Sequence, residues 1–104
     1  MRLKNLRFEP ATLSVTRGET VRFHFVNEDT VLHDVFVGDA AAQAEHERQM
    51  RGGGGHAHGS DAVDVYPGRP ESLTYTFDKA GTIEIGCHVE GHYPSGMRMT
   101  ITVT

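Results

Sequence analysis

Three side chains that could bind a metal ion recur at equal spacing near the end of the chain. Cys87, His92 and Met97 are five residues apart in the segment 86–97, which reads GCHVEGHYPSGM. On an α-helix each step of five residues turns about 500°, so the three side chains would point in different directions. The glycines and the proline of this segment also oppose a helix. We therefore expect a loop in which a thiol, an imidazole and a thioether converge.

These side chains form a soft set of metal ligands, which suits copper. In blue-copper electron-transfer sites, two histidines and a cysteine bind in a plane, and a methionine is a weak axial ligand. One more histidine is needed from elsewhere in the chain. His33 is the best candidate, because it places an imidazole within the apolar segment VLHDVFV, residues 31–37.

Each of these residues also has a simpler interpretation. Cys87, the one cysteine of the chain, cannot form an internal disulfide, so it is buried packing, a free thiol, a nucleophile or a metal ligand. His33 could be a core histidine, and Met97 could begin the apolar face of the last strand. His88 would point away from a site that Cys87 faces, so we expect it at the surface or behind the ligands. His24 lies on the polar face of its strand and is expected to be exposed.

Alternating apolar and polar residues predict that strands position these side chains. The period of two is clearest in TVRFHFVN (20–27), SLTYTF (72–77) and MTITVT (99–104). Shorter β-rich segments lie between turn signals: RLKNLRF (2–8), ATLSV (11–15), VLHDVFV (31–37), AVDV (62–65) and TIEIGC (82–87). About seven or eight strands with almost no helix predict an all-β fold, an antiparallel β-sandwich with Greek-key connections.

One segment breaks the strand pattern. Residues 39–50, DAAAQAEHERQM, are rich in alanine and glutamate and begin with the N-cap candidate Asp39, so we expect a short helix. The following RGGGGHAHGSD (51–61) is of low complexity, and its glycines lose much conformational entropy on ordering. We expect both segments in an excursion at 38–60 from a single domain at 1–104, because 104 residues suffice for one core.

The excursion holds a second group of possible copper ligands. His46 and Met50 are four residues apart and share a face of the expected helix, and His56 and His58 follow in the glycine-rich segment. Such residues could bind Cu(I) or Cu(II) weakly, or they could be solvated surface groups. Copper binding by this second group would distinguish a copper-handling protein from a simple electron carrier.

Composition and charge exclude some classes of protein. The net charge is −4 and charged residues make up 23% of the chain, without the clustered basic residues of a nucleic-acid-binding protein. No apolar run approaches the roughly 18 residues of a membrane span. The first residues, MRLKNLRFEP, lack the apolar centre of a secretory signal, but a precursor can be cut to its mature form, so this does not fix the compartment. The sequence does not indicate an oligomeric state.

Two segments together resemble the cupredoxins, the small copper proteins that include plastocyanin and azurin. The upstream strand histidine lies in FEPATLSVTRGETVRFHFVNEDTVLHDVFV (8–37), and the terminal Cys, His, Met loop lies in YTFDKAGTIEIGCHVEGHYPSGMRMTITV (75–103). The resemblance covers nearly the whole chain, and the loop is most similar to that of the bacterial periplasmic copper-resistance cupredoxins. It implies a cupredoxin-like Greek-key β-sandwich. It also implies that His33, Cys87 and His92 are strong equatorial ligands and that Met97 is the weak axial ligand.

The resemblance implies a mononuclear type 1 copper protein that cycles between Cu(II) and Cu(I), and not an enzyme that turns over a substrate. The implied cofactor is copper in one type 1 centre, and the implied location is the periplasm or cell envelope. The implied role is electron transfer, or copper homeostasis and tolerance, with a redox protein or a copper-handling protein as partner. The edge of His92, beside Tyr93 and Pro94, would be the contact for electron exchange.

The chain departs from the common family pattern beside two of the implied ligands. Asp34 follows His33 and His88 follows Cys87, whereas many cupredoxins have asparagine and a small hydroxyl residue at these places. Residues next to the ligands fix the loop and tune the thiolate. We therefore expect the colour and the reduction potential of the site to depend on these two neighbours.

Two other classes of function remain as alternatives. A copper-dependent oxidase is suggested by His56 and His58, which are similar to the His-x-His pairs of multicopper oxidases, but the chain lacks a His-Cys-His run and further pairs for a trinuclear centre. A metal-free thiol protein, such as a Cys-His hydrolase, would leave Met97 without a chemical role. Thiol reactivity with and without copper would separate these cases.

Overall fold

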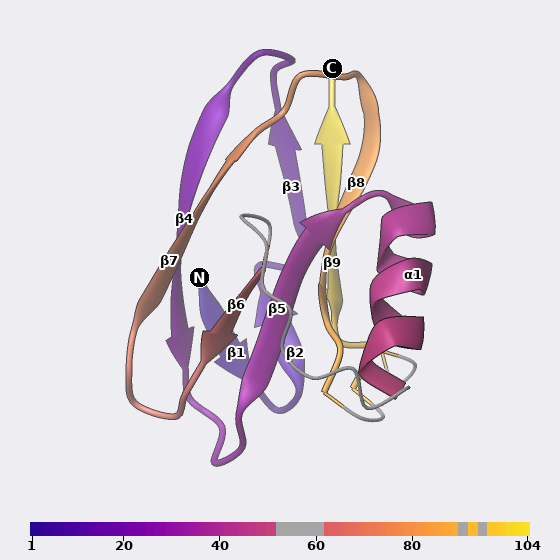
Figure 1. Ribbon diagram of the computed structural model, residues 1–104. Helices are drawn as coiled ribbons and strands as arrows, with labels where there is room; N and C mark the ends of the chain where they lie inside the picture. Colours follow the sequence, from indigo (N-terminus) through magenta and orange to yellow (C-terminus); the bar gives the residue numbers. More distant parts are fainter. Residues whose placement is uncertain (52–61, 90–91, 94–95) are drawn as a thin grey trace.

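Nine strands in two sheets and one helix make up the part of the chain that the structure describes (Figure 1). The structure is a computed structural model, and it describes residues 1–51, 62–89, 92–93 and 96–104. The elements are, in chain order, β1 (Arg2–Lys4), β2 (Arg7–Glu9), β3 (Thr12–Val15), β4 (Thr20–Asn27), β5 (His33–Gly38), α1 (Ala40–Arg51), β6 (Ala62–Val65), β7 (Glu71–Thr76), β8 (Gly81–Cys87) and β9 (Arg98–Val103). The predicted all-β class is confirmed.

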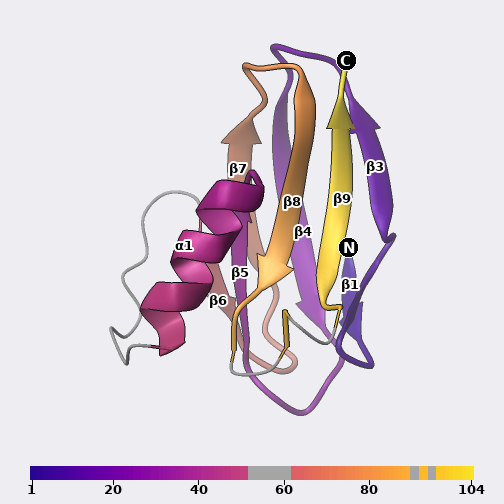
Figure 2. The same cartoon turned by 90° about the vertical axis from the view of Figure 1, so that its right-hand side faces the viewer.

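The two sheets face each other across the core. The smaller sheet has the order β2-β1-β4-β7, and the larger has the order β3-β9-β8-β5-β6. Figure 2 shows β8 and β9 of the larger sheet in front of β4 of the smaller one. Neighbouring strands are antiparallel except β1 with β4 and β3 with β9, which run parallel. The expected antiparallel sandwich is thus modified at these two pairs. Neither pair is joined by a hairpin, because β2 and β3 lie between β1 and β4 along the chain and most of the chain lies between β3 and β9.

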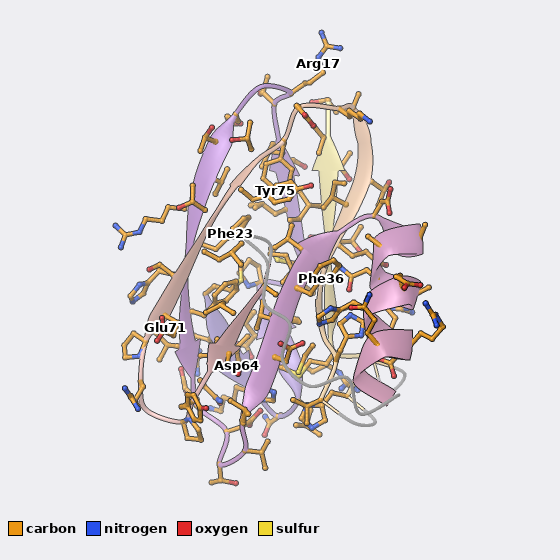
Figure 3. All side chains as sticks on the ribbon, in the orientation of Figure 1. Arg17, Phe23, Phe36, Asp64, Glu71 and Tyr75 are labelled. Carbon is orange, nitrogen blue, oxygen red and sulfur yellow. The ribbon has the colours of Figure 1, made fainter. Side chains whose placement is uncertain are left out.

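Strand alternation fills the space between the sheets with apolar side chains. On β4, Phe23 and Phe25 are buried and His24 is exposed, as the period of two predicts. Figure 3 shows Phe23 of one strand and Tyr75 of its neighbour pointing into this space. The largest fully buried apolar side chains are Phe25, Phe77, Leu3, Ile85, Met97, Met99 and Ile101. Each contributes about 1.5–3 kcal/mol by leaving water.

The first strand segment folds differently from the prediction. Residues 2–8 were expected to form one strand, but β1 and β2 pair as a hairpin, with Leu3 opposite Phe8. The turn between them places Asn5 and Leu6 at φ values of 54° and 56°. Leucine rarely adopts a positive φ, so the local sequence does not predict a turn there.

The predicted helix is present and begins where its cap was expected. Asp39 accepts a hydrogen bond from the backbone N–H of Ala42 through Oδ1 at 2.8 Å. Helix α1 packs on the outer side of β5 and β8 (Figures 1 and 2). At Gly38 a Cβ would lie 2.9 Å from the Cβ of Ala42, so glycine permits this close approach. Among the described residues, no helix is long and apolar enough to cross a membrane.

Candidate metal centre

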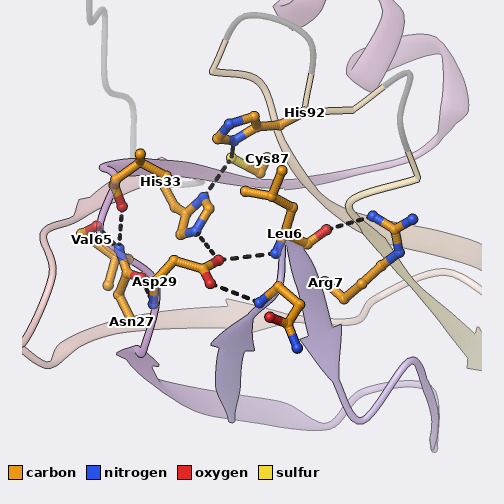
Figure 4. A network of polar contacts seen from close by, with 10 residues as sticks. Leu6, Arg7, Asn27, Asp29, His33, Val65, Cys87 and His92 are labelled. Carbon is orange, nitrogen blue, oxygen red and sulfur yellow. Dashed lines mark hydrogen bonds and ion pairs between the residues drawn. The ribbon is translucent and has the colours of Figure 1, made fainter.

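Three of the four predicted ligands meet at one end of the sandwich. The Sγ of Cys87 lies 3.4 Å from Nδ1 of His33 and 3.3 Å from Nδ1 of His92 (Figure 4). The three donor atoms all lie within 4.8 Å of one another. In the described ranges this is the one group of three or more His, Cys, Asp or Glu side chains placed closely enough to hold a metal ion.

Strand register explains why residues far apart in sequence meet here. Cys87, at the end of β8, pairs with Val35 of β5. Residues directly opposite in an antiparallel pair share a face of the sheet, and His33 lies two residues before Val35 on that same face. Both side chains therefore point into the sandwich, and both His33 and Cys87 are 0% exposed.

The loop after Cys87 returns the chain to the same place. The N–H of Met97 donates to the carbonyl of His92 at 3.1 Å, and the carbonyl of Met97 accepts the N–H of Cys87 at 3.1 Å. A further backbone bond joins the N–H of His92 to the carbonyl of Val89 at 2.9 Å. Met97 is 0% exposed, and His92 is partly exposed. The folded loop thus holds the backbone of the buried Met97 against the backbones of Cys87 and His92.

Asp29 fixes the ring of His33, a contact that the sequence reasoning missed. Its Oδ2 lies 2.9 Å from Nε2 of His33 (Figure 4). The same carboxylate accepts the backbone N–H groups of Asn5 at 2.7 Å and Leu6 at 3.0 Å, from the turn of the first hairpin. Burial opposes ionisation of Asp29, but the bonds from Leu6, His33 and Asn5 outweigh it and hold its pKa below the usual range. A signal was available, because Asp29 precedes His33 by four residues.

An ionised Asp29 can only accept hydrogen bonds, so Nε2 of His33 carries the proton. The lone pair of Nδ1 then faces the sulfur of Cys87. Burial also lowers the pKa of His33 and of His92. Both rings are therefore neutral at neutral pH, which is the form that binds a metal.

The thiol of Cys87 is held in its protonated form while no metal is bound. Burial raises its pKa to about 12, although hydrogen bonds from the backbone N–H groups of Val89 and Asp34 act in the opposite direction. A metal that binds the thiolate must therefore displace a proton. The same two N–H groups would stabilise the negative charge once it forms.

His88 is buried behind the ligands and does not lie at the surface. Its side chain is 1% exposed because α1 covers this part of β8. Its Nδ1 lies 2.7 Å from Oε1 of Glu47, and its Nε2 lies 2.6 Å from Oε1 of Gln43. Both ring nitrogens are engaged by the helix, in agreement with the expectation that His88 is not a metal ligand.

The second predicted cluster is only partly within the described residues. His46 is 7% exposed, stacks on the ring of Phe36 at 4.4 Å, and has its Nε2 2.7 Å from Oδ2 of Asp34. It is therefore not a solvated surface group. Met50 belongs to α1, but its side chain lies outside the described part, as do His56 and His58 altogether. The weak second site remains a prediction.

The donor set itself tests which metal fits. Two neutral imidazoles and one thiol that becomes a thiolate match the His₂Cys set of blue-copper sites, and a buried thioether lies next in the loop. A hard cation such as Mg²⁺ or Ca²⁺ would require oxygen ligands instead. The residues present therefore fit copper.

The sequence matches the model of a known family over almost its whole length. Residues 2–104 match the family described as copper binding proteins, plastocyanin/azurin family. The chain is 35% identical to the copper-resistant cuproprotein CopI of Pseudomonas aeruginosa, in a match that covers 97% of this chain and 72% of that protein. The chain is 38% identical to CopI of Rubrivivax gelatinosus, in a match that covers 88% of this chain and 56% of that protein.

A solved structure has the same architecture. Auracyanin A, a "blue" copper protein from the green thermophilic photosynthetic bacterium Chloroflexus aurantiacus, is 26% identical and superposes with a TM-score of 0.81. The match covers 99% of this chain and 94% of that one. The similarity thus extends over nearly the whole of both chains.

Proposed function

The chain belongs to the plastocyanin/azurin family of copper-binding proteins, and from this premise we propose that it holds one copper ion in a type 1 centre. The proposed ligands are His33, Cys87, His92 and Met97. The observation that carries this proposal is the His₂Cys donor set, whose three atoms lie within 4.8 Å of one another. Met97 is added as the weak axial ligand because it is buried and its backbone is bonded to that of Cys87 and His92.

When bound, copper would supply a one-electron couple between Cu(II) and Cu(I). The chain contributes a frame that does not need to move. Asp29 fixes the ring of His33, the strand pairing fixes Cys87, and three backbone hydrogen bonds hold the loop. A fixed frame requires little rearrangement when an electron is gained or lost. The partly exposed ring of His92 offers the contact through which a partner would exchange that electron.

The physiological role that we propose is copper tolerance in the periplasm or cell envelope, with electron transfer as its chemistry. Two relatives are named copper-resistant cuproproteins, which supports this role. The partner would be a redox protein or a copper-handling protein, and the net charge of −4 would favour a basic docking surface on it. The chain would act as a copper carrier or electron carrier, without turning over a small organic substrate.

A copper titration of the metal-free protein, followed by visible absorption and EPR, tests the proposal. We expect one intensely coloured equivalent with a small copper hyperfine splitting. Further colourless equivalents that disappear when both His56 and His58 are changed to alanine would support the weak second site, with His46 and Met50 as its other members. Absence of any coloured equivalent would overturn the type 1 assignment.

The alternatives predict different behaviour of Cys87. A thiol protein would need a reactive thiolate, whereas burial raises the pKa of this thiol to about 12. We expect slow reaction with a thiol reagent at pH 7.5 in the metal-free protein, and slower reaction after copper is added. Steady oxygen consumption with Cu(I) in excess would instead support the oxidase alternative.

A further inference from the structure

The inward face of helix α1 is polar, although it is buried against a sheet. Gln43, His46 and Glu47 are spaced three and four residues apart, so they share one face of the helix. Gln43 is 0% exposed, His46 is 7% exposed and the side chain of Glu47 is 13% exposed. Buried polar groups cost free energy unless they are hydrogen-bonded, so the partners of these three residues indicate what the face does.

Those partners are the two residues that directly follow proposed ligands. His46 bonds Asp34, which follows His33, at 2.7 Å. Gln43 and Glu47 bond the two ring nitrogens of His88, at 2.6 and 2.7 Å. The helix therefore holds the chain immediately after a ligand on β5 and immediately after a ligand on β8.

Gln43 also joins the two strands to each other. Its side-chain amide donates to the carbonyl of Phe36 on β5 at 3.1 Å and to the carbonyl of Glu84 on β8 at 2.8 Å. At Gly86, beside Cys87, a Cβ would lie 2.6 Å from Oε1 of Gln43. Glycine at this position lets the helix residue close directly onto the strand that ends in the thiol.

A short route of hydrogen bonds leads from this face to the sulfur. Val35, the residue after Asp34, lies directly opposite Cys87 in the pairing of β5 with β8. The backbone N–H groups of Asp34 and Val89 are close enough to the sulfur that their hydrogen bonding lowers the pKa of the Cys87 thiol, against the larger effect of burial. The carbonyl of Asp34 accepts the N–H of His88 at 3.1 Å. Asp34 and His88 are thus bonded to each other through their backbones, to α1 through their side chains, and through Asp34 to the sulfur.

We propose that α1 is a positioning element for the thiolate of Cys87. Its residues Gln43, His46 and Glu47 hold Asp34 and His88 so that the N–H groups of Asp34 and Val89 stay directed at the sulfur. Hydrogen bonds to the cysteine sulfur tune the reduction potential of a blue-copper site. The consequence for copper rests on the proposed function, whereas the positioning of the two N–H groups does not require a metal.

The test is the variant His46→Phe, which keeps a flat ring on Phe36 and removes the hydrogen bond to Asp34. In the metal-free protein, we expect the amide hydrogens of Asp34 and Val89 to exchange about tenfold faster than in the unchanged chain, from the loss of a hydrogen bond that supports them. In the copper-loaded protein, we expect a lower reduction potential and a changed ratio of the visible bands, because weaker N–H bonds leave more charge on the sulfur.

The matched control is Arg48→Ala, on the exposed face of the same helix. Arg48 bonds only the exposed Glu45 in the contacts described, so this variant should leave amide exchange, spectrum and potential unchanged. Unchanged exchange at Asp34 and Val89 in a folded His46→Phe protein would overturn the proposal. If His46→Phe does not fold, the variant Glu47→Ala provides the second test, because it removes the bond from the helix to His88. Unchanged exchange of the Asp34 and Val89 amides in Glu47→Ala would also overturn the proposal. If the unchanged chain gives no coloured copper complex, the proposed function fails, while the metal-free exchange still decides the positioning role.

Discussion

The two histidines that flank Cys87 are held in place by different parts of the chain. His33 begins a strand, is 0% exposed, and has its outer nitrogen bonded to the carboxylate of Asp29. His92 lies in the loop between β8 and β9, is partly exposed, and is held by backbone hydrogen bonds with Val89 and Met97. The ring of His33 is thus fixed by the side chain of Asp29, and His92 is fixed by the fold of its loop.

This difference assigns the two rings different tasks at the proposed copper centre. A buried ring with a fixed tautomer and orientation holds the geometry of the site. A ring at the edge of the loop can contact a partner without opening the core. The supports behind the ligands differ as well, because Asp29 holds the ring of His33, whereas helix α1 holds the residues that follow His33 and Cys87. Substitutions near the site should therefore disturb the His33 ring, the chain around Cys87, or both.

Removal of the Cys87 thiol, which lies between the two histidines, should have the largest effect. Cys87→Ser should abolish the intense visible absorption of the copper-loaded protein, because that band requires a copper-thiolate bond. Visible spectra of the variant after copper addition measure this, with His24→Ala, an exposed histidine on β4, as the control that keeps full colour. A band of normal intensity in Cys87→Ser would contradict the ligand assignment on both sides.

Loss of Asp29 should weaken the His33 side alone. Asp29→Ala removes a carboxylate that accepts three hydrogen bonds, and we expect unfolding of the metal-free protein to require about 2–3 kcal/mol less free energy. The ring of His33 should then populate both tautomers, which ¹⁵N NMR of the metal-free protein can detect. Glu28→Ala is the matched control, since this exposed neighbour bonds Arg2 at the surface and should change little. Equal effects of the two variants would argue against a special role for Asp29.

A methyl group added beside Cys87 should disturb the contact of helix α1 and the loop with β8. In Gly86→Ala the new Cβ would lie 2.6 Å from Oε1 of Gln43 and 2.8 Å from Cδ1 of Tyr93, so α1 or the loop must shift. We expect a loss of about 1–3 kcal/mol in denaturant unfolding, together with a changed visible spectrum of the copper form. Gly38→Ala, whose Cβ would meet Ala42 under the same helix, should cost stability and leave the spectrum as it was. A spectrum that changes equally in both variants would remove the distinction.

The smallest expected effect is the pH dependence of stability in the metal-free protein. Burial lowers the pKa of His33 and His92 below 6.5, so the unfolded chain binds more protons and stability should fall as the pH drops through and below this value. Burial raises the pKa of Cys87 from 9.0 to about 12, so its contribution is complete below pH 9 and is lost as the pH rises above it. Denaturant unfolding at pH 5, 7.5 and 10 should therefore give a maximum near 7.5. A stability that rises steadily to pH 10 would contradict the Cys87 shift.

The sequence predicted the parts of this site that depend on local pattern. Alternation predicted β4 at its observed bounds, 20–27, and the composition of 39–50 predicted a helix that is observed at 40–51. The spacing of Cys87 and His92 excluded a helix and indicated a loop. His33 was identified because an imidazole interrupts an apolar segment. These are properties of neighbouring residues, and neighbouring residues are what a sequence pattern records.

The contacts of the helix could not be predicted in the same way. His46 lies on a helix without an apolar stripe, and such a helix is usually exposed on all sides. Here the buried face is polar, and its burial is compensated by hydrogen bonds to Asp34 and His88. The same contacts bury His88, which was expected either at the surface or behind the ligands.

The chain by itself determined the donor types, their order and the strands that carry them, because these follow from residue identity and from periods of two and 3.6 residues. Only the tertiary structure decided which groups stand behind the donors. Asp29 meets both His33 and the turn at Asn5 and Leu6, and α1 meets the residues after two of the ligands, because strand register and sheet packing bring them together. Hydrogen bonds between distant segments depend on that register, and no local pattern encodes it.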